Sequence, residues 1–185
     1  MISAHLPALQ VVVPLIAAPL CVILHRGTWT WLLALLVSWA SLAISVALLG
    51  RVLDDGTLSY AFGGWEPPWG IEYRVDTLNA YVLLIVSVIG AVVLPFARRS
   101  ALDEVPESQH SLFYASFLLC LTGLLGVTIT GDAFNLFVFL EISSLSSYVL
   151  ISLGRHRRAL HAAYQGDVKH QYSEHENLIR VTWSR

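Results

Sequence analysis

Five apolar runs, each close to twenty residues long, constrain this chain more than any other feature of its sequence. About twenty helical residues are needed to cross the roughly 30 Å hydrocarbon core of a bilayer. Only 13% of the residues are charged, against about 25% in ordinary globular proteins, which excludes an ordinary soluble domain. The sequence therefore predicts an all-α membrane protein with five transmembrane helices, within residues 1–154, at residues 6–24, 29–50, 78–97, 111–129 and 133–153.

One sizeable loop, residues 51–77, separates the second and third runs. Its middle, residues 63–70, is dense in glycine and proline, which form turns. The flanks, residues 58–62 and 71–75, alternate bulky side chains with small or polar ones, as strands do. We expect a short extracytoplasmic β-hairpin lying on the bundle. Acidic residues outnumber basic ones here, and we interpret this as a solvated loop rather than a vestibule for cations.

The basic residues lie mainly on one side of a five-span arrangement. Only two arginines of the loop fall on the other side. Because positive residues concentrate in the cytoplasm, this distribution predicts an N-terminus outside the cell membrane and a cytoplasmic tail at residues 155–185. The six arginines on the cytoplasmic side are Arg26, Arg98, Arg99, Arg155, Arg157 and Arg158.

Cysteine and histidine form no recognisable cofactor site in the sequence. Cys21 and Cys120 lie in separate apolar runs, and two isolated cysteines do not hold an iron–sulfur cluster. No glycine-rich turn between a strand and a helix indicates a nucleotide site. We expect no metal and no cofactor, no redox or hydrolytic site in this chain, and, at a net charge of −2, no nucleic-acid partner. The histidines of the tail, which we expect to be unstructured, match no compact ligand spacing: His156, His161, His170 and His175.

Glu141 is an ionisable residue near the middle of the last apolar run. Placing such a group at the bilayer centre costs roughly 2.5–3.5 kcal/mol, and residues of this kind commonly mark an ion or proton path. At 3.6 residues per turn, Ser144 and Tyr148 share one helical stripe with Glu141. We therefore predict Glu141, Ser144 and Tyr148 as proton-path residues. The alternative is a buried structural carboxyl, either protonated or bonded to a neighbour, that has no transport role.

Three groups of residues together carry a resemblance to a known family. They are Leu6-Pro7 with Pro14-Leu15, the loop segment Gly63–Ile71 followed by Asp76, and the segment Asp132–Glu141. Jointly they resemble the proton-translocating antiporter-like membrane subunits. These include membrane-arm subunits of NADH:quinone oxidoreductase and large subunits of multisubunit Na⁺/H⁺ antiporters. Ser146-Ser147-Tyr148 after Glu141 is more similar to the D subunit of the multisubunit antiporters than to the respiratory subunits.

The resemblance covers residues 1 to about 165, the N-terminal part of a family with about fourteen helices. It implies that Glu141 pairs with a lysine on a later helix, and this chain carries no lysine or arginine in any span. It implies a subunit, here truncated, of a cation/proton antiporter in the cell membrane, with other membrane subunits, protons and sodium as partners. Two alternatives stay open: a membrane-arm subunit of NADH:quinone oxidoreductase, whose redox activity would reside in partner subunits, and an inert or structural fragment.

Overall fold

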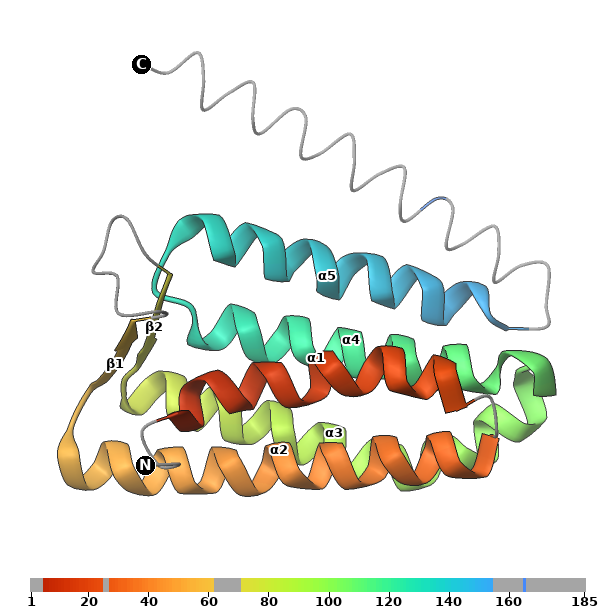
Figure 1. The fold of residues 1–185 in the computed structure, drawn as a ribbon, viewed down its shortest axis with the longest axis horizontal. Coiled ribbons are helices and arrows are strands. Elements are labelled where there is room, and N and C mark those ends of the chain that lie inside the picture. The colour runs from red at the N-terminus through yellow and green to blue at the C-terminus, as the bar shows by residue number, and fades with distance from the viewer. Residues whose placement is uncertain (1–4, 25–26, 62–70, 155–164, 166–185) are drawn as a thin grey trace, which may run out of the picture.

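Five helices lie side by side in the computed structural model, and a two-stranded hairpin lies at one end of them (Figure 1). The structure describes residues 5–24, 27–61, 71–154 and 165. Within these residues, five helices are long and apolar enough to cross a membrane, which confirms the expected five-helix membrane fold. The elements are α1 (Leu6–Leu24), α2 (Gly27–Asp55), β1 (Leu58–Ala61), β2 (Glu72–Val75), α3 (Thr77–Glu104), η3 (Glu107–Gln109), α4 (His110–Ile129) and α5 (Ala133–Ser152).

The predicted hairpin is confirmed, and it is tied to the turn between α4 and α5. β1 and β2 pair antiparallel, with Leu58 opposite Val75. Tyr73 of β2 forms an isolated bridge with Thr130, and the Gly131 amide donates to the Glu72 carbonyl at 2.9 Å. The hairpin therefore fixes the place where α5 starts. The glycine- and proline-rich turn expected at residues 63–70 and the tail from residue 155 lie outside the described part, apart from residue 165.

Two helices continue beyond the spans expected from hydropathy. α2 runs past Gly50 to Asp55, with Val52 buried and Arg51 paired with Asp55 at 3.8 Å. It ends where Gly56 adopts a φ of 81° and donates its amide to the Val52 carbonyl, a left-handed cap that suits glycine. α3 passes Pro95 and the arginine pair and ends at Glu104. Burial of Ala101 against the bundle explains this extension, because tertiary packing outweighs local breaking signals.

α4 is the central helix of the described bundle. It packs against α1, α2, α3 and α5, and 56% of its apolar window is buried. α5 packs mainly against α4, and only 17% of its window is buried (Figure 1). One long flank of α5 is therefore not covered by the other described helices.

The buried apolar side chains form two clusters, one near each end of the bundle. The cluster at the hairpin end contains Leu48, Leu83 and Leu125. The cluster at the opposite end contains Leu94 and Leu118. The hydrophobic effect contributes little to the association of helices in lipid, because lipid tails are as apolar as these side chains. The helices therefore associate mainly through close packing of their side chains.

Candidate functional site

The helix that carries Glu141 begins at a side-chain cap. Asp132 stands at the N-cap of α5, and its Oδ1 accepts a hydrogen bond from the Asn135 amide at 2.8 Å. Its Oδ2 accepts a second bond from Asn135 Nδ2 at 2.7 Å. A cap of this kind satisfies a backbone amide that has no partner inside the helix. The Asp132 side chain therefore holds the first turn of α5.

The rotation of α5 is set by close packing on α4. A Cβ added at Gly126 would lie 2.4 Å from the Phe139 ring, and one at Gly123 would lie 2.7 Å from the backbone nitrogen of Ser143. One turn further, Cys120 Sγ lies 3.4 Å from Ser147 Oγ. The two glycines thus permit close contact between α4 and α5. Ser143 and Ser147 are packing residues on the side of α5 that faces α4.

Glu141 lies on the side of α5 that is turned away from α4. It is two residues from Phe139 and from Ser143, which corresponds to about 200° around a helix. Ser144 and Tyr148 follow on the same side, and all three residues are half-buried. The Oε1 atom of Glu141 is screened from solvent. The structure thus places the three predicted proton-path residues along one flank of one helix, and their role stays a prediction.

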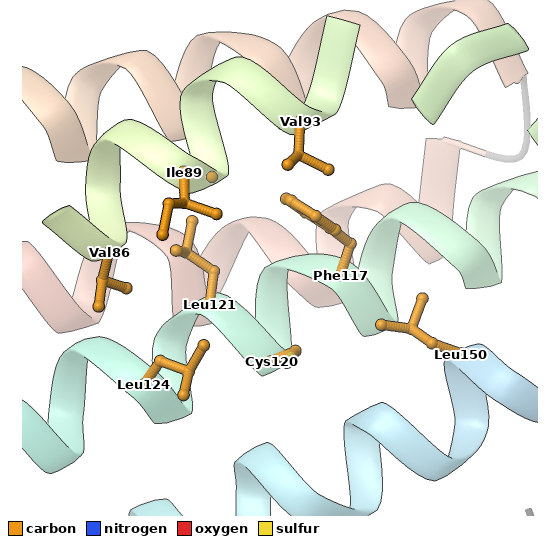
Figure 2. Close-up of a pocket in the computed structure, with 9 residues that line it drawn as sticks. Val86, Ile89, Val93, Phe117, Cys120, Leu121, Leu124 and Leu150 are labelled. Atoms are coloured by element: carbon orange, nitrogen blue, oxygen red, sulfur yellow. The ribbon is translucent and has the colours of Figure 1, made fainter. Parts of the chain in front are cut away.

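A groove bounded by α3, α4 and α5 lies beside this helix (Figure 2). It encloses about 210 Å³, and Val86, Ile89 and Val93 of α3 face Leu121 and Phe117 of α4 across it. Leu150 contributes from α5. The lining is apolar apart from the thiol of Cys120, so the groove offers hydrocarbon surface and no acceptor for a proton.

No metal-ligating cluster occurs among the residues that the structure describes. Groups of three or more His, Cys, Asp or Glu side chains close enough to hold a metal ion are absent from that part of the chain. The histidines His156, His161, His170 and His175 lie outside it. The chemistry available on α5 is therefore that of one carboxyl group and neighbouring hydroxyl groups.

Sequence reasoning missed a second polar site, which lies on α1, α2 and α3. Gln10 of α1 is fully buried and donates to Ser45 of α2 and Ser87 of α3. The available signal was the single long amide side chain in the first apolar run. The partners were not readable from the sequence because they come from two other helices.

Comparisons with known proteins agree with the fold and with the motifs. No family model matches the chain. The chain is 42% identical over 164 residues to the N subunit of NADH-quinone oxidoreductase from Desulforudis audaxviator, covering 87% of this chain and 32% of the relative. It is 31% identical over 150 residues to the D subunit of the Na⁺/H⁺ antiporter from Bacillus subtilis, covering 79% of this chain and 29% of the relative.

A solved structure shares the arrangement of the helices. The membrane-bound sulfane sulfur reductase, an archaeal respiratory membrane complex, contains a chain that matches with a TM-score of 0.79 and 28% identity. The match covers 89% of this chain and 34% of that one. The chain spans about a third of the length of the relatives it matches. Both families named by the resemblance are thus confirmed as homologues over that part.

Proposed function

We propose that this chain, a homologue of the antiporter-like membrane subunits over about a third of their length, is a membrane subunit of a multisubunit cation/proton antiporter. It takes part in proton and sodium transport together with other membrane subunits. The observation that supports this is Glu141, a carboxyl within an apolar span, on the flank of α5 that α4 does not cover. A charge at that depth is costly in lipid, so such residues usually face a protein interior or a water-filled cavity.

The neighbouring residues suit transfer of a proton. Glu141 accepts the proton on its carboxylate and releases it again, and the hydroxyl groups of Ser144 and Tyr148 lie one and two turns along the same stripe. Hydroxyl groups both donate and accept hydrogen bonds, so they can hold water beside the carboxyl. α5 is held at its start by Asp132 and along its length by α4, which keeps the stripe in one orientation.

One observation favours a second candidate function. The relative that is 42% identical is a subunit of NADH-quinone oxidoreductase, and that identity exceeds the 31% with the antiporter relative. In this second reading the chain is a membrane-arm subunit of a proton-pumping respiratory complex, and Glu141 has the same role. Co-purification separates the two: partner subunits that carry iron–sulfur clusters indicate the respiratory complex, and partners without them indicate the antiporter.

The transport role is tested by growth of a sodium-sensitive bacterial host that produces the chain with its co-purifying subunits. We expect Glu141→Gln to abolish sodium tolerance, since the amide cannot release a proton, and Glu141→Asp to retain part of it. Ser143→Ala is a matched control, because Ser143 packs on α4 and stands outside the stripe. Equal growth of the wild type and Glu141→Gln, at equal amounts of protein in the membrane, would remove the transport proposal.

We also propose an orientation for this multi-pass protein in the cell membrane. The N-terminus and the hairpin lie outside the cell, and the end of α3 with Arg98 and Arg99 lies in the cytoplasm. The charge distribution supports this orientation, because arginine is concentrated at one end of the spans. Arg98 also stacks over Trp31 at 4.3 Å, an arrangement suited to the boundary between lipid and water.

A further inference from the structure

A layer of buried polar side chains crosses α1, α2 and α3. The helix α4 lies between these helices and α5 (Figure 1). The layer consists of Gln10, Ser41, Ser45 and Ser87, none of which is more than 1% exposed. The serines lie between the two apolar clusters. On α3, for example, Ser87 follows Leu83 of one cluster and precedes Leu94 of the other. A polar layer therefore interrupts the apolar core of the bundle.

The amide of Gln10 joins the three helices. Its Nε2 donates to Ser45 Oγ at 2.8 Å and to Ser87 Oγ at 3.3 Å. The two hydroxyl oxygens lie 2.6 Å apart, and Ser45 Oγ also donates to the Leu83 carbonyl at 3.4 Å. The donor side of the amide is thus fully used.

The acceptor side of the same amide has no partner among the described residues. Gln10 Oε1 is buried without a hydrogen bond from that part of the chain, and so are Ser41 Oγ and Ser38 Oγ. Pro14 adds another acceptor, since it has no amide to donate to the Gln10 backbone carbonyl four residues earlier. Leaving such groups without a hydrogen bond in an apolar interior is destabilising.

The packing of α1 against α2 places these unbonded polar groups at the same height along the bundle. Gln10 contacts Ser45, and nearer the other end of the pair Cys21 Sγ lies 3.9 Å from the Thr30 carbonyl. The two helices therefore run antiparallel. Pro14, about one turn after Gln10, comes opposite Ser41, about one turn before Ser45. The carbonyl freed by Pro14 and the hydroxyl of Ser41 are thus on facing turns.

We propose that this layer binds an ordered water molecule between α1 and α2, held by Gln10 Oε1, the Gln10 backbone carbonyl and the hydroxyl of Ser41. A buried water typically makes about three hydrogen bonds to polar groups that lack other partners. Freed carbonyls at membrane depth are known to be satisfied by serine side chains and ordered water. The site goes beyond the proposed transport function, because α4 stands between it and Glu141.

Water fits the site better than a sodium ion. A sodium ion is coordinated by oxygen atoms alone. None of the four side chains of the layer carries a negative charge that would balance the charge of such an ion. The Ser41 hydroxyl can both donate and accept a hydrogen bond, and a water molecule can pair with it in either way. A cation would leave the hydroxyl proton without an acceptor. Water also remains bound if the Gln10 amide turns over and presents Nε2 instead of Oε1.

The site is tested by water-to-protein magnetisation transfer in solid-state NMR of the full chain in lipid bilayers, observed at the Gln10 side-chain amide. We expect Gln10 to receive magnetisation much faster than the methyl groups of Val11, which is also buried. Ser41→Ala should slow the transfer to Gln10 towards the rate of Val11. Ser146→Ala, which removes a buried hydroxyl bonded to the Ile142 carbonyl on α5, should leave it unchanged.

Three outcomes would overturn the proposal. Transfer to Gln10 in the wild type that is as slow as transfer to Val11 means that the layer is dry. Fast transfer that persists in Ser41→Ala means that the water is not held by Ser41. A signal that changes when sodium chloride is replaced by choline chloride assigns the site to a cation instead.

Discussion

At the scale of single residues, Gly126 determines how closely α4 and α5 approach. The Phe139 ring occupies the space that a side chain at Gly126 would need, at 2.4 Å from an ideal Cβ. Gly126→Ala therefore forces either the ring or α5 to move, and we expect a loss of about 1–3 kcal/mol in the free energy of unfolding. Reversible unfolding in mixed detergent micelles measures it.

The control for this prediction is Gly50→Ala. Gly50 also lies inside a helix, yet a Cβ there meets nothing within 4 Å. The substitution should stabilise slightly, because alanine restricts the unfolded chain more than glycine does. Equal effects of the two substitutions would show that the contact between Gly126 and Phe139 does not set the distance between the helices.

Tyr73 makes the hairpin sensitive to alkaline pH. Burial, and then the charge of Asp132, raises the pKa of Tyr73 to about 12 from its ordinary value of 10.0. The folded state therefore holds the phenol proton more tightly than the unfolded state. The stability that this provides is complete below pH 10 and is lost as the pH rises towards 12. Tyr73→Phe should remove this part of the alkaline loss, as measured by unfolding at a series of pH values. An unchanged pH profile in Tyr73→Phe would contradict the assignment.

At the scale of elements, α3 and α5 begin with the same kind of N-terminal cap. Asp76 accepts a hydrogen bond from the Asn79 amide at 2.7 Å, as Asp132 does from Asn135 at 2.8 Å. Both caps lie at the hairpin end of the bundle (Figure 1). Two of the helices that bound the groove of Figure 2, α3 and α5, are therefore each capped by an aspartate that binds the amide of an asparagine three residues later.

Removing one cap should loosen one helix only. Asp132→Ala should cost about 1 kcal/mol and accelerate hydrogen exchange of the Asn135 amide, because that amide loses its acceptor. Asp76→Ala is the matched variant and should accelerate exchange at Asn79 while α5 stays protected. If Asp132→Ala leaves the exchange at Asn135 unchanged, the cap does not hold the start of α5.

Element types were predictable from the sequence because run length and turn residues are local signals. The five apolar runs each gave a helix, and the two alternating flanks gave β1 and β2. The helix ends at Asp55 and Glu104 were not predictable. They depend on the burial of Val52 and Ala101 against other helices, which outweighs the breaking tendency of Gly50 and Pro95.

The candidate site was predictable in part, for a related reason. Helical periodicity alone places Glu141, Ser144 and Tyr148 on one stripe. Which way the stripe faces depends on Gly123 and Gly126 meeting Ser143 and Phe139, contacts between helices that the sequence does not reveal. The buried layer around Gln10 requires three helices at once and was missed entirely.

At the scale of the whole molecule, the two ends of the bundle differ in charge and in structure. The hairpin end carries β1, β2 and both caps, and the other end carries Arg98 and Arg99. The proposed orientation predicts that a membrane-impermeant maleimide labels Ser59→Cys, exposed on β1, in intact cells. Ser108→Cys, exposed in η3, should be labelled only after the membrane is opened. Labelling of Ser108→Cys in intact cells would reverse the orientation.

The proposed transport function requires that protons pass beside Glu141. The most direct measurement is the sodium-induced change of an acid-interior pH gradient in everted membrane vesicles that contain the chain and its partner subunits. We predict that sodium collapses the gradient with the wild type, partly with Glu141→Asp, and not with Glu141→Gln at equal protein levels. A full response with Glu141→Gln would contradict the proposed transport role, because an amide does not ionise and so cannot take up and release a proton in transport.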